Sequence, residues 1–111
     1  MELHERPWGC FEIVCEKPTF WVRRLHIDPM HRLSMQRHLH RDEVWFVERG
    51  GGEAIVDSAV WLISTGAKIE VPRRTWHRLA AGDSGLTVIE VADGEPKETD
   101  IERSEDDYGR A

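Results

Sequence analysis

The chain of 111 residues has only two cysteines and one tyrosine, and it lacks any apolar segment approaching the roughly 20 residues of a membrane-spanning helix. Cys10 and Cys15 are separated by an odd number of positions, which places them on opposite faces of one strand. We therefore expect two free, buried and unreactive cysteines rather than a disulfide. Free thiols are typical of a reducing cytoplasm. The first residues contain no hydrophobic signal region, so we expect a cytoplasmic protein.

Positive charge is also scarce, because 15 Lys and Arg residues stand against 21 Asp and Glu residues and leave a formal net charge of −6. This balance argues against non-specific binding to nucleic acid and against adhesion to acidic membranes. Much of the acidity lies after residue 92, whereas the middle of the chain carries most of the arginines. The middle is therefore suited to an anionic small molecule, and we expect neither a nucleic-acid nor a membrane partner.

Helical periodicity is nearly absent from the sequence. Short apolar or alternating segments recur at intervals of roughly ten residues and are separated by Gly, Pro and Asp, which is typical of an all-β sandwich or barrel. Turns are predicted at 50–52 and 82–85, and at most one turn of helix at 102–107. The predicted strands are 11–15, 20–27, 33–40, 44–48, 54–56, 60–63, 68–71, 76–80 and 86–91. The length fits one domain, with a core at about 6–92 and a polar tail at 93–111.

The segment from Gln36 to Gly50 gives the strongest indication of function. On a regular strand the side chains of Gln36, His38 and His40 point the same way, and Glu43 can rejoin them after the next turn. Imidazole and carboxylate groups on one face are typical ligands of a divalent metal ion. The segment therefore predicts a metal site.

The spacing of this segment resembles the first of two motifs of the cupin superfamily, which are small β-barrels. One residue separates Gln36 from His38, four separate His38 from Glu43, and six separate Glu43 from Gly50. The second motif is matched by Gly66 and Pro72, followed by a histidine. The resemblance implies a single-domain cupin, that is, a double-stranded β-helix or jelly-roll barrel. The metal ligands that it implies are Gln36, His38, Glu43 and His77.

Several further strings are spread over nearly the whole chain: Arg6-Pro-Trp-Gly9, Leu33-Ser-Met-Gln-Arg-His38 with His40-Arg41, Trp76-His-Arg-Leu79, Ile89-Glu-Val91 and Glu105-Asp-Asp-Tyr-Gly-Arg110. Together they resemble type II mannose-6-phosphate isomerase. In that family the cupin is commonly the C-terminal domain of a bifunctional enzyme that also makes GDP-mannose. A glycine-rich nucleotide loop is missing from these 111 residues, so GDP-mannose synthesis is not expected of them.

The resemblance implies interconversion of mannose 6-phosphate and fructose 6-phosphate, a step in nucleotide-sugar and polysaccharide precursor metabolism. The reaction moves a proton between C1 and C2 and needs one divalent cation, here Zn, Mn, Co, Ni or Fe, because N and O ligands suit all of these. It also needs a proton carrier. His40 is our first candidate, with Glu90 behind it. His40 has two alternative roles, as a ligand in place of Gln36 or as a hydrogen-bond partner of a ligand.

The substrate phosphate needs a cation, and a guanidinium matches phosphate oxygens bidentately. Arginines of the middle and second half are the candidates, and two arginines of the tail are expected to close over the barrel mouth. The first group is Arg24, Arg74 and Arg78, and the tail pair is Arg103 and Arg110. Five tryptophans, at 8, 21, 45, 61 and 76, are expected to pack in the core or at an interface.

Met30 and Arg74 stand where the family usually has glycine. A side chain at these positions is expected to remove a positive-φ conformation and to add bulk near the mouth. These departures leave two alternatives open. One is a non-catalytic, metal-containing cupin that binds a sugar or sugar phosphate. The other is a cupin enzyme of another class, such as a dioxygenase, against which the amide at Gln36 argues. Open strand edges and the cupin resemblance further predict a homodimer.

Overall fold

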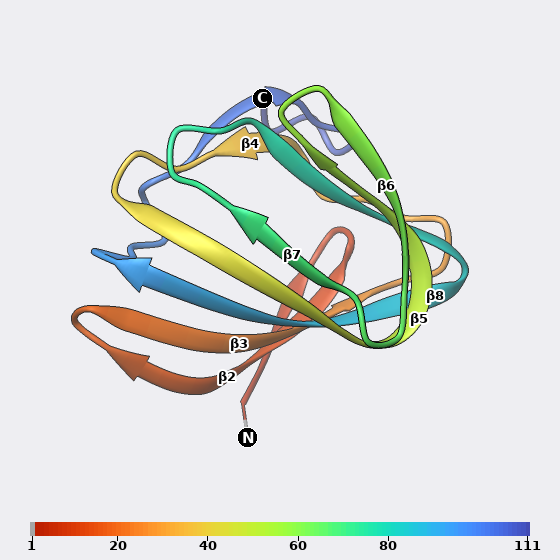
Figure 1. The fold of residues 1–111 in the computed structure, drawn as a ribbon, viewed down its shortest axis with the longest axis horizontal. Helices are drawn as coiled ribbons and strands as arrows, with labels where there is room; N and C mark the ends of the chain where they lie inside the picture. Colours follow the sequence, from red (N-terminus) through yellow and green to blue (C-terminus); the bar gives the residue numbers. More distant parts are fainter. Residues whose placement is uncertain (1) are drawn as a thin grey trace.

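The computed structural model describes residues 2–111, and all regular structure in this range is β-strand (Figure 1). The predicted all-β class is therefore confirmed, and no helix in this range could cross a membrane. The strands are β1 (Leu3–Arg6), β2 (Gly9–Lys17), β3 (Phe20–Ile27), β4 (Met35–Arg37), β5 (Arg41–Val56), β6 (Ala59–Ser64), β7 (Lys68–Val71), β8 (His77–Gly94) and β9 (Glu102–Glu105).

The two long strands β5 and β8 pair with each other and run through both halves of a curled sheet (Figure 1). The first part of β5 pairs with the last part of β8, and there β7 lies beside β5 while β3, β2 and β1 continue beyond β8. The remaining parts of β5 and β8 also pair, with β6 beside β5, and with β4 and then β9 beside β8. The sheet thus curls around one interior.

The predicted turns at 50–52 and 82–85 are wrong, because both segments lie inside the long strands. The pairing register of β5 and β8 shifts between Gly50 and Gly52. A Cβ atom at Gly50, where φ is 87°, would lie 2.2 Å from the carbonyl oxygen of Gly85. A Cβ atom at Gly52 would lie 2.0 Å from the carbonyl oxygen of Ala80. These glycines let two backbones approach closely where the strands bend, rather than ending the strands.

The strand predicted at 33–40 is reduced to β4, and the helical turn predicted at 102–107 is instead strand β9. β4 ends early because the backbone N–H groups of Leu39 and His40 donate to the Asp100 carboxylate, each at 2.9 Å. They are therefore not available for a strand ladder. β3 and β7 have the predicted bounds, whereas the sequence reasoning missed β1.

The expectation that side chains at positions 30 and 74 remove a positive-φ conformation is wrong. Met30 has φ 60° and Arg74 has φ 66°, and both residues are exposed. Met30 is the third residue of a turn closed by the His31 N–H, which donates to the Asp28 carbonyl at 3.0 Å. With proline at 29 and positive φ at 30, this turn is of type II, which favours glycine at that position. The backbone conformation is retained at an energetic cost.

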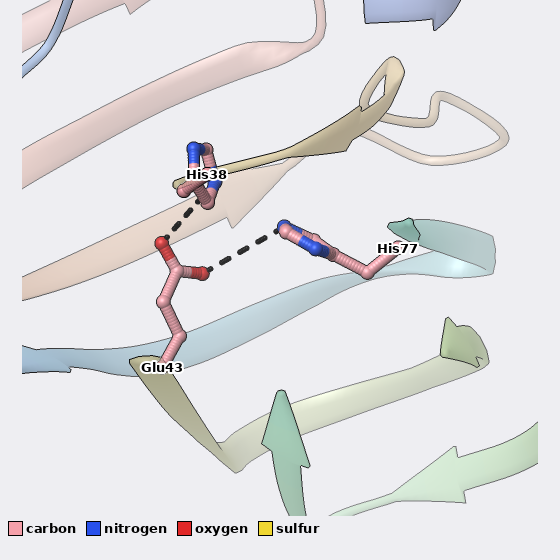
Figure 2. A group of neighbouring side chains, drawn as sticks. All are labelled: His38, Glu43 and His77. Carbon is pink, nitrogen blue, oxygen red and sulfur yellow. Dashed lines mark ion pairs between the residues drawn. The ribbon is translucent and has the colours of Figure 1, made fainter. Parts of the chain in front are cut away.

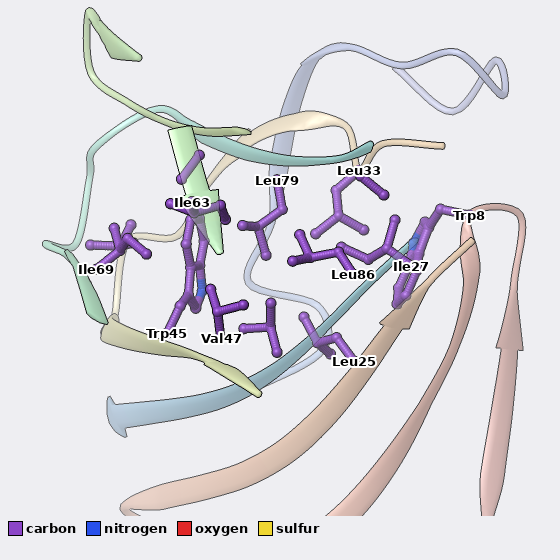
Figure 3. Packing of buried hydrophobic residues seen from close by; sticks show 14 of the residues in the cluster. Trp8, Leu25, Ile27, Leu33, Trp45, Val47, Ile63, Ile69, Leu79 and Leu86 are labelled. Carbon is purple, nitrogen blue, oxygen red and sulfur yellow. The ribbon is translucent and has the colours of Figure 1, made fainter. Parts of the chain in front are cut away.

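The core fills the space inside the curled sheet (Figure 3). Trp8, Trp21 and Trp45 are buried as expected, whereas Trp61 is 57% exposed on the outer surface. Cys10 and Cys15 are free but only half-buried, which corrects the expectation that they are fully buried. Figure 3 labels ten residues of the core: Trp8, Leu25, Ile27, Leu33, Trp45, Val47, Ile63, Ile69, Leu79 and Leu86.

Candidate metal centre

Three of the predicted metal ligands meet inside the curled sheet (Figure 2). His38 follows β4, Glu43 lies near the start of β5, and His77 is the first residue of β8. The His38 Nε2 atom lies 3.4 Å from Glu43 Oε2, and the His77 Nε2 atom lies 4.0 Å from Glu43 Oε1. All three side chains are buried. One ligand atom from each residue lies within 4.8 Å of the others, a spacing that one metal ion can span.

Gln36, the fourth predicted ligand, is held beside this group by strand pairing. Gln36 of β4 lies directly opposite His77 of β8, and residues opposite each other share one face of a sheet. Its side-chain oxygen accepts a hydrogen bond from the Ser34 hydroxyl at 2.8 Å. This contact orients the amide and leaves the second lone pair of that oxygen for another partner.

Both imidazoles present Nε2 to the centre, because their Nδ1 atoms are engaged by backbone carbonyls. His38 Nδ1 donates to the Asp100 carbonyl at 2.7 Å, and His77 Nδ1 donates to the Thr75 carbonyl at 2.9 Å. Burial lowers the pKa of His38 to about 4 and also lowers the pKa of His77. His77 Nε2 is buried and has no hydrogen-bond partner within residues 2–111. Neutral imidazoles oriented through Nδ1 are the usual state of metal-ligating histidines.

Glu43 is held ionised at the centre. Trp45 Nε1 donates to Glu43 Oε1 at 3.1 Å, and Arg41 Nε donates to Glu43 Oε2 at 2.8 Å. Burial alone would raise the pKa of Glu43. Attraction to His77 and His38, which are protonated only in acid, and to the Arg41 guanidinium outweighs burial and lowers it. Because both imidazoles are neutral near pH 7, Arg41 is the permanent cation of this group. One carboxylate and two neutral imidazoles make a donor set that fits a divalent ion.

Arg41 was given no role by the sequence reasoning, yet it contacts two of the ligand side chains. Besides Glu43, its guanidinium reaches His38 Nε2 at 3.2 Å, and it donates to the Lys97 carbonyl at 2.9 Å. Arg41 is itself buried. A metal ion bound to His38 Nε2 would need the lone pair that Arg41 now engages. The metal ion and the guanidinium therefore compete for the same atoms.

A cavity adjoins the centre and is rich in arginine. Gln36, His38 and Glu90 line it, so it reaches two of the predicted ligands. Trp21 Nε1 donates to Glu90 Oε2 at 2.9 Å. Burial, followed by the nearby negative charge of Glu43, raises the pKa of Glu90 to about 8. The arginines of the lining are Arg6, Arg23, Arg41, Arg103 and Arg110.

Of the predicted substrate-binding and catalytic residues, Glu90 and the tail pair Arg103 and Arg110 line this cavity. Arg78 is buried elsewhere, where it donates to the Leu33 carbonyl at 3.0 Å and to Glu105 at 3.2 Å. The other three lie outside the lining: His40 and Arg74 are exposed, and Arg24 pairs with carboxylates of β2 and β5. Their proposed roles stay predictions.

The arginine that β3 turns toward the cavity is Arg23, which the sequence reasoning missed. Side chains alternate along a strand, and Arg23 shares its face with the buried Trp21 and Leu25 rather than with Arg24. The alternation Trp21, Arg23, Leu25 was the signal that could have identified it.

Comparison with known sequences places these features in context. The sequence family described as "Mannose-6-phosphate isomerase C-terminal" matches residues 2–106. The chain is 39% identical over 107 residues to the alginate biosynthesis protein AlgA of Pseudomonas aeruginosa, covering 95% of this chain and 22% of that protein. It is 36% identical over 107 residues to a mannose-1-phosphate guanylyltransferase of Escherichia coli, covering 95% of this chain and 23% of that protein. The chain thus spans less than a quarter of the length of these relatives.

Solved structures show the same fold at low sequence identity. An RmlC-like cupin from Shewanella frigidimarina superposes with a TM-score of 0.80 at 14% identity, covering 87% of this chain and 86% of that chain. KdgF from Halomonas sp. superposes with a TM-score of 0.80 at 18% identity, covering 88% of this chain and 90% of that chain. These likenesses concern the fold alone, and they confirm the expected cupin barrel.

Proposed function

The chain belongs to the mannose-6-phosphate isomerase C-terminal family, and from this premise we propose that it is a metal-dependent isomerase of mannose 6-phosphate and fructose 6-phosphate. The observation that carries the proposal is one cavity lined by predicted metal ligands, a protonatable buried carboxyl group and several arginines. We place the reaction in the cytoplasm, in the supply of precursors for polysaccharides. The relatives named for alginate biosynthesis and for mannose-1-phosphate support this setting.

His38, Glu43 and His77 would hold the divalent ion, since they offer two neutral imidazoles and one carboxylate around one point. Gln36, opposite His77 in the sheet, would add an amide oxygen. When bound, the ion would polarise the sugar carbonyl and stabilise the negative charge that develops on it. Zn, Mn, Co, Ni and Fe all suit this donor set.

Glu90 is the side chain that we assign to proton transfer between C1 and C2. It lines the cavity, and its raised pKa lets it both hold and release a proton near neutral pH. Trp21 Nε1 binds Glu90 Oε2, so Oε1 is left to face the sugar. His40 is exposed and outside the cavity lining, which favours Glu90 over His40 as the carrier.

The proposal is tested by incubating the purified chain with mannose 6-phosphate and Mn²⁺, Co²⁺ or Zn²⁺ in turn, and by measuring fructose 6-phosphate in a coupled assay. We expect turnover that a chelator abolishes. The Glu90→Gln variant is expected to lower kcat by roughly 10²- to 10⁴-fold, whereas His40→Ala retains most of the activity. A folded, metal-loaded native chain that forms no fructose 6-phosphate with any of these ions contradicts the proposal.

A second candidate is a non-catalytic cupin that binds the same sugar phosphate. The contacts of Arg41 with His38 Nε2 and Glu43 favour it, because an internal cation there can stabilise the carboxylate without a metal ion. Binding of fructose 6-phosphate without turnover by any metal-loaded form would favour this candidate over the isomerase.

A further inference from the structure

The cavity beside the metal centre has a positive lining in a chain whose net charge is −6. Five arginines face only two glutamates, and one of these, Glu90, is largely protonated near neutral pH because burial raises its pKa. The lining residues therefore carry an excess of positive charge, part of which Glu43 and Asp106, outside the lining, offset by pairing with Arg41 and Arg110. Such an excess in a partly enclosed site attracts an anion.

Three of the five arginines are already engaged. Arg41 is bound to Glu43, and Arg110 donates to both oxygens of Asp106, at 2.9 Å each. Arg6 donates to a backbone carbonyl next to it, that of Glu5. Of the other two, Arg103 has no ion pair in the described part of the chain, and Arg23 pairs only with carboxylates that are themselves exposed, so these two are the candidates for an external anion.

Arg23 is fixed in place yet has an unused donor. Its guanidinium stacks on the Trp21 ring, with 3.6 Å from Cζ to the ring centroid, and on the Phe11 ring at 4.6 Å. The side chain is only 8% exposed, and its Nε atom is buried without a hydrogen-bond partner within residues 2–111. Burying a rigid guanidinium with an unpaired N–H group costs free energy unless a ligand accepts a hydrogen bond from that group.

Arg103 reaches the same cavity from β9, and like Arg23 it has an unused hydrogen-bond donor. Its Nε atom is also buried without a partner in the described part of the chain. Burial and then the neighbouring charge of Arg110 lower the pKa of Arg103, so this cation lies in an unfavourable field. A bound anion would accept the missing hydrogen bond from Arg103 and offset the repulsion between Arg103 and Arg110.

Two carboxylates pair with Arg23. Glu16 of β2 lies outside the cavity lining, 3.9 Å from Arg23 Nη2, whereas Glu98 lines the cavity. Glu98 comes from the segment between β8 and β9, and its carboxylate pairs with Arg23 Nη1. Glu98 is 55% exposed on its side chain, in contrast to Arg23. An exposed side chain is free to swing away at little cost, so Glu98 can give up this position to a stronger anion. A phosphate monoester carries up to two charges and three acceptor oxygens, against one charge and two oxygens for Glu98.

We propose that Arg23 and Arg103 form the phosphate subsite of this cavity, and that the Glu98 carboxylate occupies this subsite until a phosphate group displaces it. The identity of the ligand as a sugar phosphate rests on the proposed function, whereas the anion site itself does not. Phosphate held there leaves the sugar in the same cavity as Gln36, His38 and Glu90.

Binding of inorganic phosphate, fructose 6-phosphate and fructose to the purified full chain, measured by calorimetry in phosphate-free buffer, tests the subsite. We expect fructose to bind far more weakly than fructose 6-phosphate. Arg23→Gln and Arg103→Gln should each weaken phosphate binding by roughly tenfold or more, because each removes a charge-assisted hydrogen bond. Arg49→Gln removes an exposed arginine outside this cavity and should leave binding unchanged.

The Glu98→Gln variant tests the phosphate subsite even if Arg23→Gln does not fold. Glu98 is exposed, so its substitution is expected to preserve the fold. The substitution should tighten phosphate binding several-fold. Unchanged or weaker binding in Glu98→Gln, or no phosphate binding by the native chain, overturns the subsite. Phosphate binding that follows the expected pattern, in a chain without isomerase activity, supports the subsite and contradicts only the proposed reaction.

Discussion

Glu43 and Glu90 are both buried in the same interior, yet their surroundings drive them to opposite states. Glu43 accepts hydrogen bonds from Arg41 and Trp45 and stays ionised, whereas Glu90 has only the Trp21 N–H and holds its proton. Two carboxyl groups with pKa values driven apart are suited to different tasks. Glu43 is therefore suited to bind a cation, and Glu90 is suited to carry a proton.

The raised pKa of Glu90 makes stability depend on pH. The native state keeps the Glu90 proton up to about pH 8, whereas the unfolded chain releases it near 4.5, so the native state loses stability as pH rises through this window. In the Glu90→Gln variant this position no longer titrates, so the variant lacks this loss of stability. Its amide oxygen can still accept the hydrogen bond from Trp21. The free energy of unfolding of Glu90→Gln, relative to the native chain, should rise by a few kcal/mol between pH 5 and pH 8.

Denaturant unfolding of both proteins at several pH values measures this difference. The other charged groups of the cavity lining and the nearby Glu43 are common to both proteins, so their contributions largely cancel in the comparison. The lining groups are Arg6, Arg23, Arg41, Glu98, Arg103 and Arg110. A difference that stays constant with pH would show that Glu90 does not titrate as described.

A separate prediction concerns the effect of Arg41 on the affinity for the metal ion. Because its guanidinium engages His38 Nε2 and Glu43 Oε2, a metal ion must displace it. Arg41→Gln should therefore raise the affinity for Co²⁺ or Zn²⁺ by roughly tenfold, since one charged contact no longer has to be broken. The metal-free variant should be less stable, because Glu43 loses its cation. Calorimetric titration with the metal tests this, and an equal or lower affinity in the variant contradicts it.

At the scale of single elements, the turns at Met30 and Arg74 store strain. Both residues have positive φ, which L side chains rarely adopt, and neither side chain is buried. Met30→Gly and Arg74→Gly should each raise the free energy of unfolding by about 0.5–1 kcal/mol. Arg49→Gly, at an exposed strand position without positive φ, should lower it by a similar amount. Thermal and denaturant unfolding measure the changes, and destabilisation by all three would disprove strain at the two turns.

Elements defined by local sequence were predictable, and those defined by distant partners were not. β3, β7 and the two-residue hairpin loop at Asp57–Ser58 follow from alternation and turn residues. Gly50 and Gly52 look like a turn in the sequence, but their role is set by the approach of β8. β4 is short because Asp100, some sixty positions later, binds the backbone after it. No local pattern contains that information.

The candidate site also contains some residues that the sequence predicted and others that depend on distant partners. Motif spacing was enough to place His38, Glu43 and His77 together. The tail pair Arg103 and Arg110, expected at the barrel mouth, lines the cavity. The arginine of β3 was harder, because strand register decides that Arg23 rather than Arg24 faces inward.

At the scale of the whole molecule, one outer surface lacks a partner. Within residues 2–111, β6 pairs only with β5, which leaves its outer edge open. Val60, Trp61 and Leu62 of this strand are 59%, 57% and 89% exposed. An open strand edge with large apolar side chains is suited to pairing with a second copy of the same strand. The predicted homodimer is therefore expected to form through β6.

Light scattering after size-exclusion chromatography tests the dimer. The native chain should have the mass of two chains, and Leu62→Glu should shift it to one chain without loss of fold, because Leu62 is almost fully exposed. Asp83→Lys, a charge change at an exposed position of β8 outside this surface, serves as the control. A native chain that remains monomeric at high concentration contradicts this assignment of the surface.

The proposed activity depends on one metal centre, and metal analysis of the purified protein is the most direct test of that centre. After exposure to excess Co²⁺ or Zn²⁺ and removal of unbound ion, the native chain should retain one ion per chain, and His38→Ala should retain almost none while keeping the same circular dichroism spectrum. His31→Ala, which removes an exposed histidine outside the cluster, should match the native chain. A His38→Ala variant that keeps a full equivalent of metal would contradict the assignment of His38, Glu43 and His77 as the centre.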